Sequence, residues 1–280
     1  MAECKADMKG RNPYLPAAAL ALCLAAPALL VGTAAGAAAI DHDREFQACV
    51  ELAERAPADA LDSARGWQNR GGGDRARLCQ ALALFHKGDF KEAGTRLEEL
   101  APLLGRESPQ AEASILARAG WAWLRAGDEA RAERLYGIAL AKQPEDVDLH
   151  IDRAIARAEA ERYWDAIADL DAALAKAPRR ADAYFYRAAA HKALSNLRQA
   201  LADADQSLHL RPDNPETLLL RGNIHALSGG LNAARRDWER ILRTAPESAP
   251  AKAARSNLER LPPADAEPAP KPERDKPKKP

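Results

Sequence analysis

The residues best suited to chemistry are two cysteines, Cys49 and Cys79, and a histidine, His86, in the same part of the chain. A thiolate beside an imidazole is the basis of thiol catalysis, and cysteine with histidine is a common donor set for zinc. No CxxC pair and no paired Cys/His spacing surrounds these residues. A thiol or metal enzyme built on them is therefore the last of three functional hypotheses, and the other two require no catalysis.

Other catalytic patterns are missing from the sequence. It contains no Walker loop, GxSxG, HExxH or dinucleotide fingerprint. The glycine run at 71–73 has no neighbouring strand, so we interpret it as a connector and not as a phosphate cradle. Acidic residues are abundant, but none is paired in a way that singles out a general acid and a general base. We expect no enzyme activity, no metal and no cofactor.

Composition limits the partners. The 280 residues carry 41 basic and 41 acidic side chains, so the net charge is zero and no global field attracts nucleic acid. Aromatic residues make up only 5%, and a core built mainly from alanine and leucine suits closely packed helices. We therefore expect a helical chain that does not bind nucleic acid.

Residues 1–39 differ from the rest and are predicted to be a secretory signal segment. Lys9 and Arg11 precede the apolar run PAAALALCLAAPALLVG, and the small residues Ala37 and Ala39 mark a peptidase cut before Ile40. The protein is then exported, periplasmic or secreted, and is not inserted in the membrane after cleavage. The alternative is an uncleaved anchor in the inner membrane, which the shortness of the run disfavours.

Two details of this segment have alternatives. A lipoprotein site at Cys23 is disfavoured because Leu22 stands where a small residue is expected. Met8 gives a more usual basic start than Met1, so translation from Met8 is an alternative. Neither detail changes the prediction of export.

Export decides how the remaining cysteines are used. Removal of the signal segment leaves Cys49 and Cys79, both in helical sequence. In an exported protein the simplest use of two thiols is one disulfide, which for a loop of this length contributes about 3 to 4 kcal/mol. The alternatives are two buried, inert thiols or half of a metal site.

The middle of the chain is repetitive. Four prolines stand 34 residues apart, and rows of 34 starting at 113, 147, 181 and 215 also align small residues at positions 8, 20 and, in three rows, 27. Small side chains let two helices approach closely, so each row is predicted to be a helical hairpin that ends at its proline. The aligned prolines are Pro144, Pro178, Pro212 and Pro246, and position 8 holds Gly120, Ala154, Ala188 and Gly222.

Two histidines share a position in consecutive rows. His191 and His225 both stand at position 11, and a metal site there needs further ligands. Among the other histidines, only His150 stands at a nearby position of its row. We interpret the two histidines as packing side chains.

The pattern of small residues and proline resembles the tetratricopeptide-repeat family, which it matches over residues 113–248. Aromatic positions are only partly kept, with Tyr136 and Trp238 at position 24. The resemblance implies an all-α fold, a right-handed α-solenoid of helix-turn-helix repeats, with four repeats of 34 residues at 113–248.

The flanks of this array depart from the pattern. Residues 40–112 are predicted to form degenerate capping hairpins, including a weak row from Asp74 that the irregular stretch PLLGRESPQ separates from the first full repeat. Residues 249–261 are predicted to form a capping helix, since the ends of a solenoid meet water. Residues 262–280 hold seven prolines in 19 residues, which is typical of a disordered tail; contact with an acidic surface or the cell wall is the alternative.

Charged residues also recur in register. Position 7 is arginine and position 23 is aspartate in the last three repeats, and both are lost together in the first, to Ala119 and Leu135. We interpret this as an ion pair between the two helices of each repeat; solvated surface charges are the alternative. The predicted pairs are Arg153 with Asp169, Arg187 with Asp203, and Arg221 with Asp237.

The resemblance also implies where a partner binds. In this family the first helices of successive repeats line a concave groove with positions 2, 5, 9, 12 and 13. Here those positions are apolar at the centre and charged at the edges, which suits a peptide with hydrophobic side chains. The predicted groove residues are Trp121, Leu124, Arg125, Ile151, Ile155, Phe185, Lys192, Leu219 and Asn223.

The first hypothesis is therefore a non-catalytic scaffold of the cell envelope that binds a protein or peptide in this groove. Chaperone-binding relatives clamp a terminal carboxylate with lysine and asparagine; only Asn223 matches, so that activity is not implied. The second hypothesis is a structural protein of the envelope that self-associates into homo-oligomers and is tethered to the envelope by its C-terminal tail. For the groove itself, the alternative is that its apolar side chains pack against adjoining repeats or a second copy.

Overall fold

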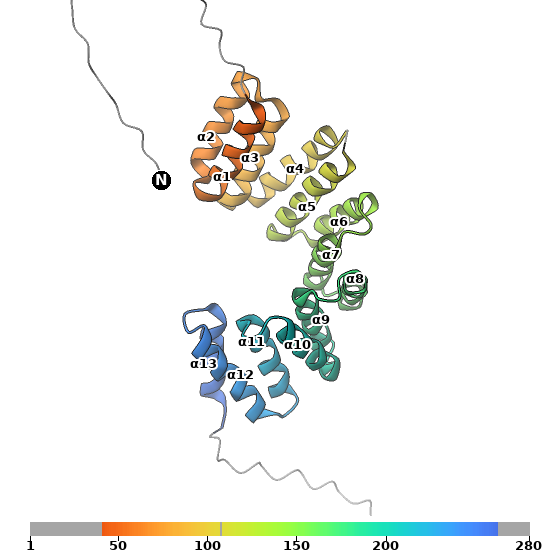
Figure 1. Ribbon diagram of the computed structural model, residues 1–280, viewed down its shortest axis with the longest axis vertical. Helices are drawn as coiled ribbons and strands as arrows, with labels where there is room; N and C mark the ends of the chain where they lie inside the picture. The colour runs from red at the N-terminus through yellow and green to blue at the C-terminus, as the bar shows by residue number, and fades with distance from the viewer. Residues whose placement is uncertain (1–40, 107, 263–280) are drawn as a thin grey trace, which may run out of the picture. The chain divides into compact units, whose positions relative to one another are not determined.

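The computed structural model describes residues 41–106 and 108–262, which form α-helices and one short π-helix without any strand (Figure 1). The predicted signal segment at 1–39 and the tail beyond residue 262 lie outside the described residues. Helices that are consecutive in the chain pack against each other as hairpins, and the hairpins follow one another in chain order. The prediction of an all-α stack of hairpins is confirmed.

Each full row of 34 residues forms one hairpin of a first helix, A, and a second helix, B. The A helices are α5 (Pro109–Arg125), α7 (Val147–Glu159), α9 (Ala181–Ala193) and α11 (Pro215–Leu227). The B helices are α6 (Glu129–Lys142), α8 (Tyr163–Lys176), α10 (Leu197–Leu210) and α12 (Leu231–Thr244).

The four hairpin turns share one backbone conformation. Gly127 and Gly229 adopt left-handed φ values of 77° and 80°, and Glu161 and Ser195 adopt 59° and 62° at the same position of their rows. Glycine enters this region freely, whereas a side chain there costs about 1 to 2 kcal/mol. The packing of helix A on helix B therefore imposes the same turn on sequences that do not favour it.

The close approach of A and B depends on the small residues. A Cβ atom added to Gly120 would lie 2.9 Å from the Tyr136 ring, and one added to Gly222 would lie 2.5 Å from the Trp238 indole. The two rows with alanine at position 8 hold a smaller side chain at position 24. Volume is thus balanced across each hairpin, as close packing requires.

The N-terminal part extends the stack. It comprises α1 (His42–Arg55), α2 (Pro57–Trp67), the π-helix Gln68–Gly72, α3 (Gly73–Lys87) and α4 (Phe90–Leu104). The stretch predicted to be irregular is helical only at its two ends, because Pro102 lies inside α4 and α5 already begins at Pro109. Residues 105, 106 and 108 between these helices are not helical. Ser108 caps the start of α5 by accepting a hydrogen bond from the Ala111 amide at 3.1 Å, so this helix begins ahead of the repeat period.

The last described helix, α13 (Ala249–Arg260), packs against α11 and α12. Its buried side is made of Pro250, Ala251 and Ala254, whereas Lys252 and Arg255 are exposed. A polar outer side is what a terminal helix of a stack needs.

The A helices also contact one another, α5 with α7, α7 with α9, and α9 with α11. The main contacts of the B helices are with A helices. The A helices are therefore drawn together on one side of the stack. We call the surface formed by α5, α7, α9 and α11 on that side the inner face.

Candidate functional site

Most of the predicted groove residues are partly exposed, and Arg125 is exposed. Several also pack on the core: Ile155, Phe185 and Leu219 each rest against a different buried cluster. Such half-buried side chains are fixed in place yet offer one apolar side to a partner. The predicted residues that are partly exposed are Trp121, Leu124, Ile155, Phe185, Lys192, Leu219 and Asn223.

Ile151 is a correction to the predicted groove. Its side chain is only 4% exposed and packs in the cluster that contains Leu170 and Ala183. The neighbouring residue Asp152 lines a cavity instead.

Two further predicted residues already have partners within the chain. The Arg125 guanidinium lies 4.6 Å from the centre of the Phe90 ring. The Asn223 Oδ1 atom accepts a hydrogen bond at 3.0 Å from Asn257 of α13, 34 residues later. Asn257 was missed because the sequence analysis counted α13 as a cap and not as a further A helix.

A first cavity of about 250 Å³ lies between α1, α3, α5 and α7. Its apolar wall combines Phe85 with Trp121, and it also holds the carboxylate of Asp152. Burial is the main reason that the pKa of Asp152 is raised to about 7. The remaining lining residues are Glu54, Leu82, His86, Ala117 and Arg118.

A second cavity of about 460 Å³ lies between α7, α8 and α9. Ile155 and Ala158 contribute one side of it, and Phe185 and Ala189 contribute the other. It is therefore mainly apolar and continues the surface that Trp121 begins.

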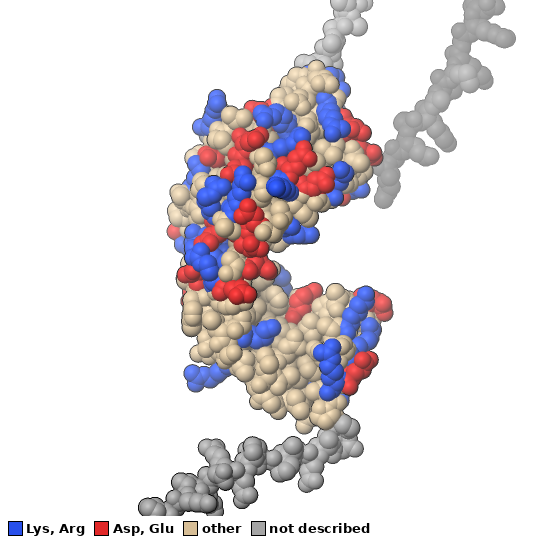
Figure 2. Space-filling view, turned by 180° about the vertical axis from the view of Figure 1, so that it is seen from behind, with Lys and Arg blue, Asp and Glu red and all other residues tan. Residues whose placement is uncertain are grey.

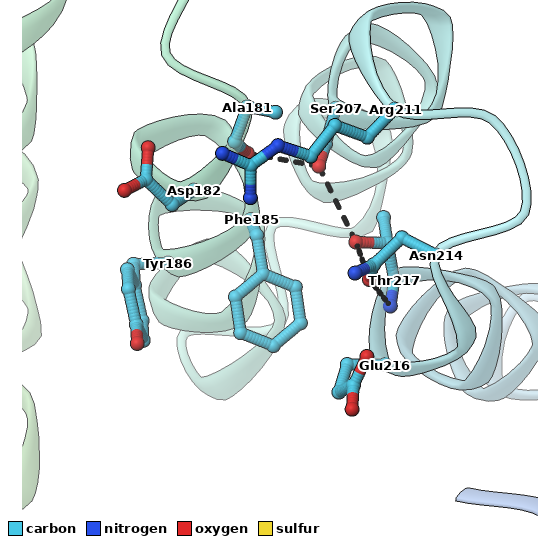
Figure 3. A pocket seen from close by; sticks show the side chains of 9 residues that line it. All are labelled: Ala181, Asp182, Phe185, Tyr186, Ser207, Arg211, Asn214, Glu216 and Thr217. Atoms are coloured by element: carbon cyan, nitrogen blue, oxygen red, sulfur yellow. Dashed lines mark hydrogen bonds between the residues drawn. The ribbon is translucent and has the colours of Figure 1, made fainter. Parts of the chain in front are cut away.

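A third cavity of about 180 Å³ lies on the other side of Phe185, where α9, α10 and α11 meet (Figure 3). Its floor is polar, because the buried Ser207 hydroxyl donates to the Ala181 carbonyl and lies 3.3 Å from the Thr217 hydroxyl. Asn214 caps α11 by accepting from the Thr217 amide at 2.8 Å. In Figure 3 the Arg211 side chain extends toward Ala181, and its guanidinium is drawn above the Phe185 ring.

Cys49 of α1 and Cys79 of α3 face each other. Their Cα atoms are 6.1 Å apart, which is within the range of disulfides. Both residues are buried. His86 lies near the C-terminal end of α3, exposed to solvent, and its ring lines the first cavity.

The other candidates for chemistry are dispersed. In the part of the chain that the structure describes, no three His, Cys, Asp or Glu residues converge in a way that could hold a metal ion. Gly72, in the predicted connector, is buried against the Trp67 indole. Burial lowers the pKa of His191. Among the described helices, none is long and apolar enough to cross a bilayer.

Comparison with solved structures identifies the arrangement. PilW, a widely conserved type IV pilus biogenesis factor, is similar with a TM-score of 0.62 and 18% identity, over 76% of this chain and 97% of that one. TTC0263, a thermophilic TPR protein of Thermus thermophilus, is similar with a TM-score of 0.55 and 20% identity, over 67% and 100%. MamA of Desulfovibrio magneticus RS-1 is similar with a TM-score of 0.54 and 18% identity, over 63% and 97%. A scan against protein-family models finds no match, and neither does a search of curated protein sequences.

This is the tetratricopeptide-repeat fold. The resemblance inferred from the small residues and the prolines is confirmed at the level of the fold, so the hairpins are repeats in the tetratricopeptide sense. The fold places equivalent positions of the rows at equivalent places in the hairpins, so the charged positions can be compared between repeats.

The three predicted arginine–aspartate pairs are in contact. The shortest nitrogen–oxygen distances are 2.6 Å for Arg153 with Asp169, 2.7 Å for Arg187 with Asp203 and 2.6 Å for Arg221 with Asp237. The three aspartates are buried, at 4%, 7% and 5% exposure, so these are not solvated surface charges.

The row from Asp74 makes the same contact with other residues. There the two positions hold Gln80 and Arg96, and the Arg96 guanidinium donates to the Gln80 side chain at 3.1 Å. In the first full repeat the two positions hold Ala119 and Leu135, both buried. These two residues belong to the same hydrophobic cluster, so the two positions are at least partly buried in each case while their chemistry varies.

The sequence analysis missed a second acid on two of the arginines. Asp171 of the preceding repeat lies 2.6 Å from Arg187, and Asp205 lies 2.7 Å from Arg221. Both acids stand at position 25, where the first repeat has Gly137. The hydrogen bonds that Arg187 donates to Asp203, and then to Asp171, raise the pKa of its guanidinium. Each arginine thus joins two repeats.

Charges of both signs are mixed over the N-terminal part of the face seen in Figure 2, whereas its C-terminal part is largely uncharged. Charges of opposite sign also pair between repeats, since Glu133 of α6 contacts Arg157 at 2.9 Å and Arg162 at 2.6 Å. Mutual compensation leaves no single-sign patch over this part of the face.

Proposed function

We propose that this chain is a non-catalytic adaptor that binds a protein or peptide partner on its inner face. The observation that carries the proposal is the row of cavities along that face, in which Trp121, Ile155 and Phe185 are held half-buried. A surface fixed in this way loses little conformational entropy on binding. Apolar side chains of an extended or helical peptide fit such a row.

Affinity capture from a cell-envelope fraction tests this assignment. The bait variant Trp121→Ala with Phe185→Ala should lose the partner that the wild type retains. Trp164, 64% exposed on the B helix α8, offers a matched control, and Trp164→Ala should keep the partner. Equal capture by all three folded baits would place binding elsewhere than on the inner face.

The envelope location is part of the proposal and is supported by the signal pattern at 1–39. We expect the mature protein isolated from an envelope fraction to begin at Ile40. Recovery of a longer chain in the membrane pellet would instead favour an uncleaved anchor.

Self-association is the second candidate, and exposed apolar residues favour it. Trp164 and Leu227 are each 64% exposed, outside the core of any repeat. Light scattering at micromolar concentration separates the two functions, because an adaptor remains monomeric. A dimer that Trp164→Ala dissociates would support the structural role.

A further inference from the structure

Asp152 is the partly buried acid of the first cavity, whose other acid, Glu54, is exposed; it stands on α7 between the apolar side chains of α3 and α5. No basic side chain of the described residues forms an ion pair with it. The cation that lowers its pKa is Arg180, which is already paired with Asp148 and with Asp182, each at 2.7 Å. Its carboxylate is therefore partly desolvated without a compensating partner, which is unfavourable in a folded chain.

The other charged groups around Asp152 do not supply that partner. Asp146 and Asp148 at the start of α7 add negative charge, and the hydroxyls of Tyr136 and Tyr186 are neutral. Glu54, Arg118 and His86 line the same cavity, and the charge of Glu54 is opposite in sign to that of Arg118. The surroundings of Asp152 are thus net negative or neutral.

The equivalent positions show that the acid is not required by the repeat. Position 6 holds Arg118, Tyr186 and Leu220 in the other three full repeats. The raised pKa means that ionised Asp152 weakens the folded state at neutral pH. A residue that lowers the stability of the fold and lines an open cavity is expected where the cavity binds a ligand.

The rest of the cavity suits a long cationic side chain. Trp121 and Phe85 present aromatic rings, which attract ammonium and guanidinium groups, and Leu82 adds aliphatic surface. Lysine and arginine pack their carbon stems on apolar surface while the charged end reaches a polar group. An acidic or purely apolar side chain would leave Asp152 without a counter-charge.

We propose that the first cavity takes a lysine or arginine side chain of the partner, with its charged end against Asp152 and its stem along Trp121. This inference rests on the proposed function of the inner face. It adds that the partner peptide carries a basic residue next to its apolar ones.

A displayed random-peptide library selected on the full mature chain tests the inference. Wild type should enrich peptides that carry a lysine or arginine at a fixed distance from an aromatic or aliphatic residue. Asp152→Asn should lose this enrichment. Asp59→Asn, which removes the same charge from an exposed site on α2, should keep it.

One selected peptide then gives the quantitative test. Replacing its lysine by norleucine, or its arginine by citrulline, should weaken binding to wild type roughly tenfold and should have little effect on Asp152→Asn. Binding to wild type should also weaken as the pH falls below about 7, because a cation prefers the ionised carboxylate. The pH effect should be absent in Asp152→Asn.

The outcomes separate the inference from the proposed function. The inference is overturned if the selected peptides carry no basic residue, or if Asp152→Asn enriches the same basic peptides as wild type. Binding of a partner on the inner face is then still tested separately by Trp121→Ala with Phe185→Ala. A wild-type chain that enriches no peptide overturns both. Circular dichroism of each variant confirms that it is folded.

Discussion

Arg187 donates two hydrogen bonds to Asp203 across its own hairpin, at 2.8 and 2.7 Å, and reaches Asp171 of the preceding repeat with its third nitrogen. Asp203 is buried, whereas the Asp171 side chain is 57% exposed. The same arginine therefore makes one desolvated and one solvated pair, and the two should differ in strength.

We expect Asp203→Asn to lower the free energy of unfolding by about 2 to 4 kcal/mol, because it leaves the Arg187 charge partly buried. Asp171→Asn should cost at most about 1 kcal/mol. Chemical denaturation measures both values. A double-mutant cycle of Arg187→Met with Asp203→Asn should give a coupling above about 1 kcal/mol, and the absence of coupling would contradict a structural role for the pair.

The pH dependence of stability should report on Asp152. Its pKa is raised from 3.8 to about 7 in the folded chain, chiefly by burial. The unfolded chain thus loses this proton near pH 4 and the folded chain near pH 7, so stability falls across that window and the loss is constant above it. Asp152→Asn should be about as stable as wild type below pH 4 and more stable by on the order of 1 to 3 kcal/mol at pH 8. Asp59→Asn is the control, and an equal gain at all pH values would rule out this titration.

The fold could be predicted because each position of the repeat occurs several times. Four prolines and four small residues recur at the same positions of the rows, so the repeat is recognisable even where one row departs from the pattern. Arg187 with Asp203 is likewise one of three copies of the same pair. Local details occur once and have no such support. Ile151 is buried in the cluster that also holds Ala183 of the next repeat, and Ser108 caps α5 ahead of the repeat period. These outcomes depend on neighbours that the row alignment does not bring together.

Asp152 illustrates a different reason for a miss. It stands at position 6, which the resemblance does not assign to the groove, and an isolated acid on a helix gives no sequence signal. Only the packing of α7 beside α3 and α5 shows that it lines a cavity with Trp121. Asn257 was missed similarly, since its contact with Asn223 requires α13 to continue the array.

The cysteine pair should stabilise the N-terminal end of the stack. We propose that Cys49 and Cys79, 30 residues apart, form a disulfide in the exported protein. Cys49→Ser with Cys79→Ser should then lower the free energy of unfolding by about 3 kcal/mol, and amide hydrogen exchange should increase first in α1. Wild type under reducing conditions should behave in the same way. Alkylation of both thiols in folded, non-reduced, exported protein would refute the bond.

Because the four hairpin turns share one backbone conformation, glycine and alanine substitutions in them should change the free energy of unfolding in opposite directions. Glu161→Gly and Ser195→Gly should each raise the free energy of unfolding by about 0.5 to 1 kcal/mol, because they remove a side chain from a left-handed position. Gly127→Ala, at the equivalent position of the first full repeat, should lower it by about 1 kcal/mol. Gly137, inside helix α6 with open space where a Cβ atom would stand, is the matched control, and Gly137→Ala should raise stability by about 0.5 to 1 kcal/mol. Denaturant midpoints of the four variants measure the differences. Destabilisation by both Gly127→Ala and Gly137→Ala would show that loss of glycine itself, and not the left-handed turn, sets the effect.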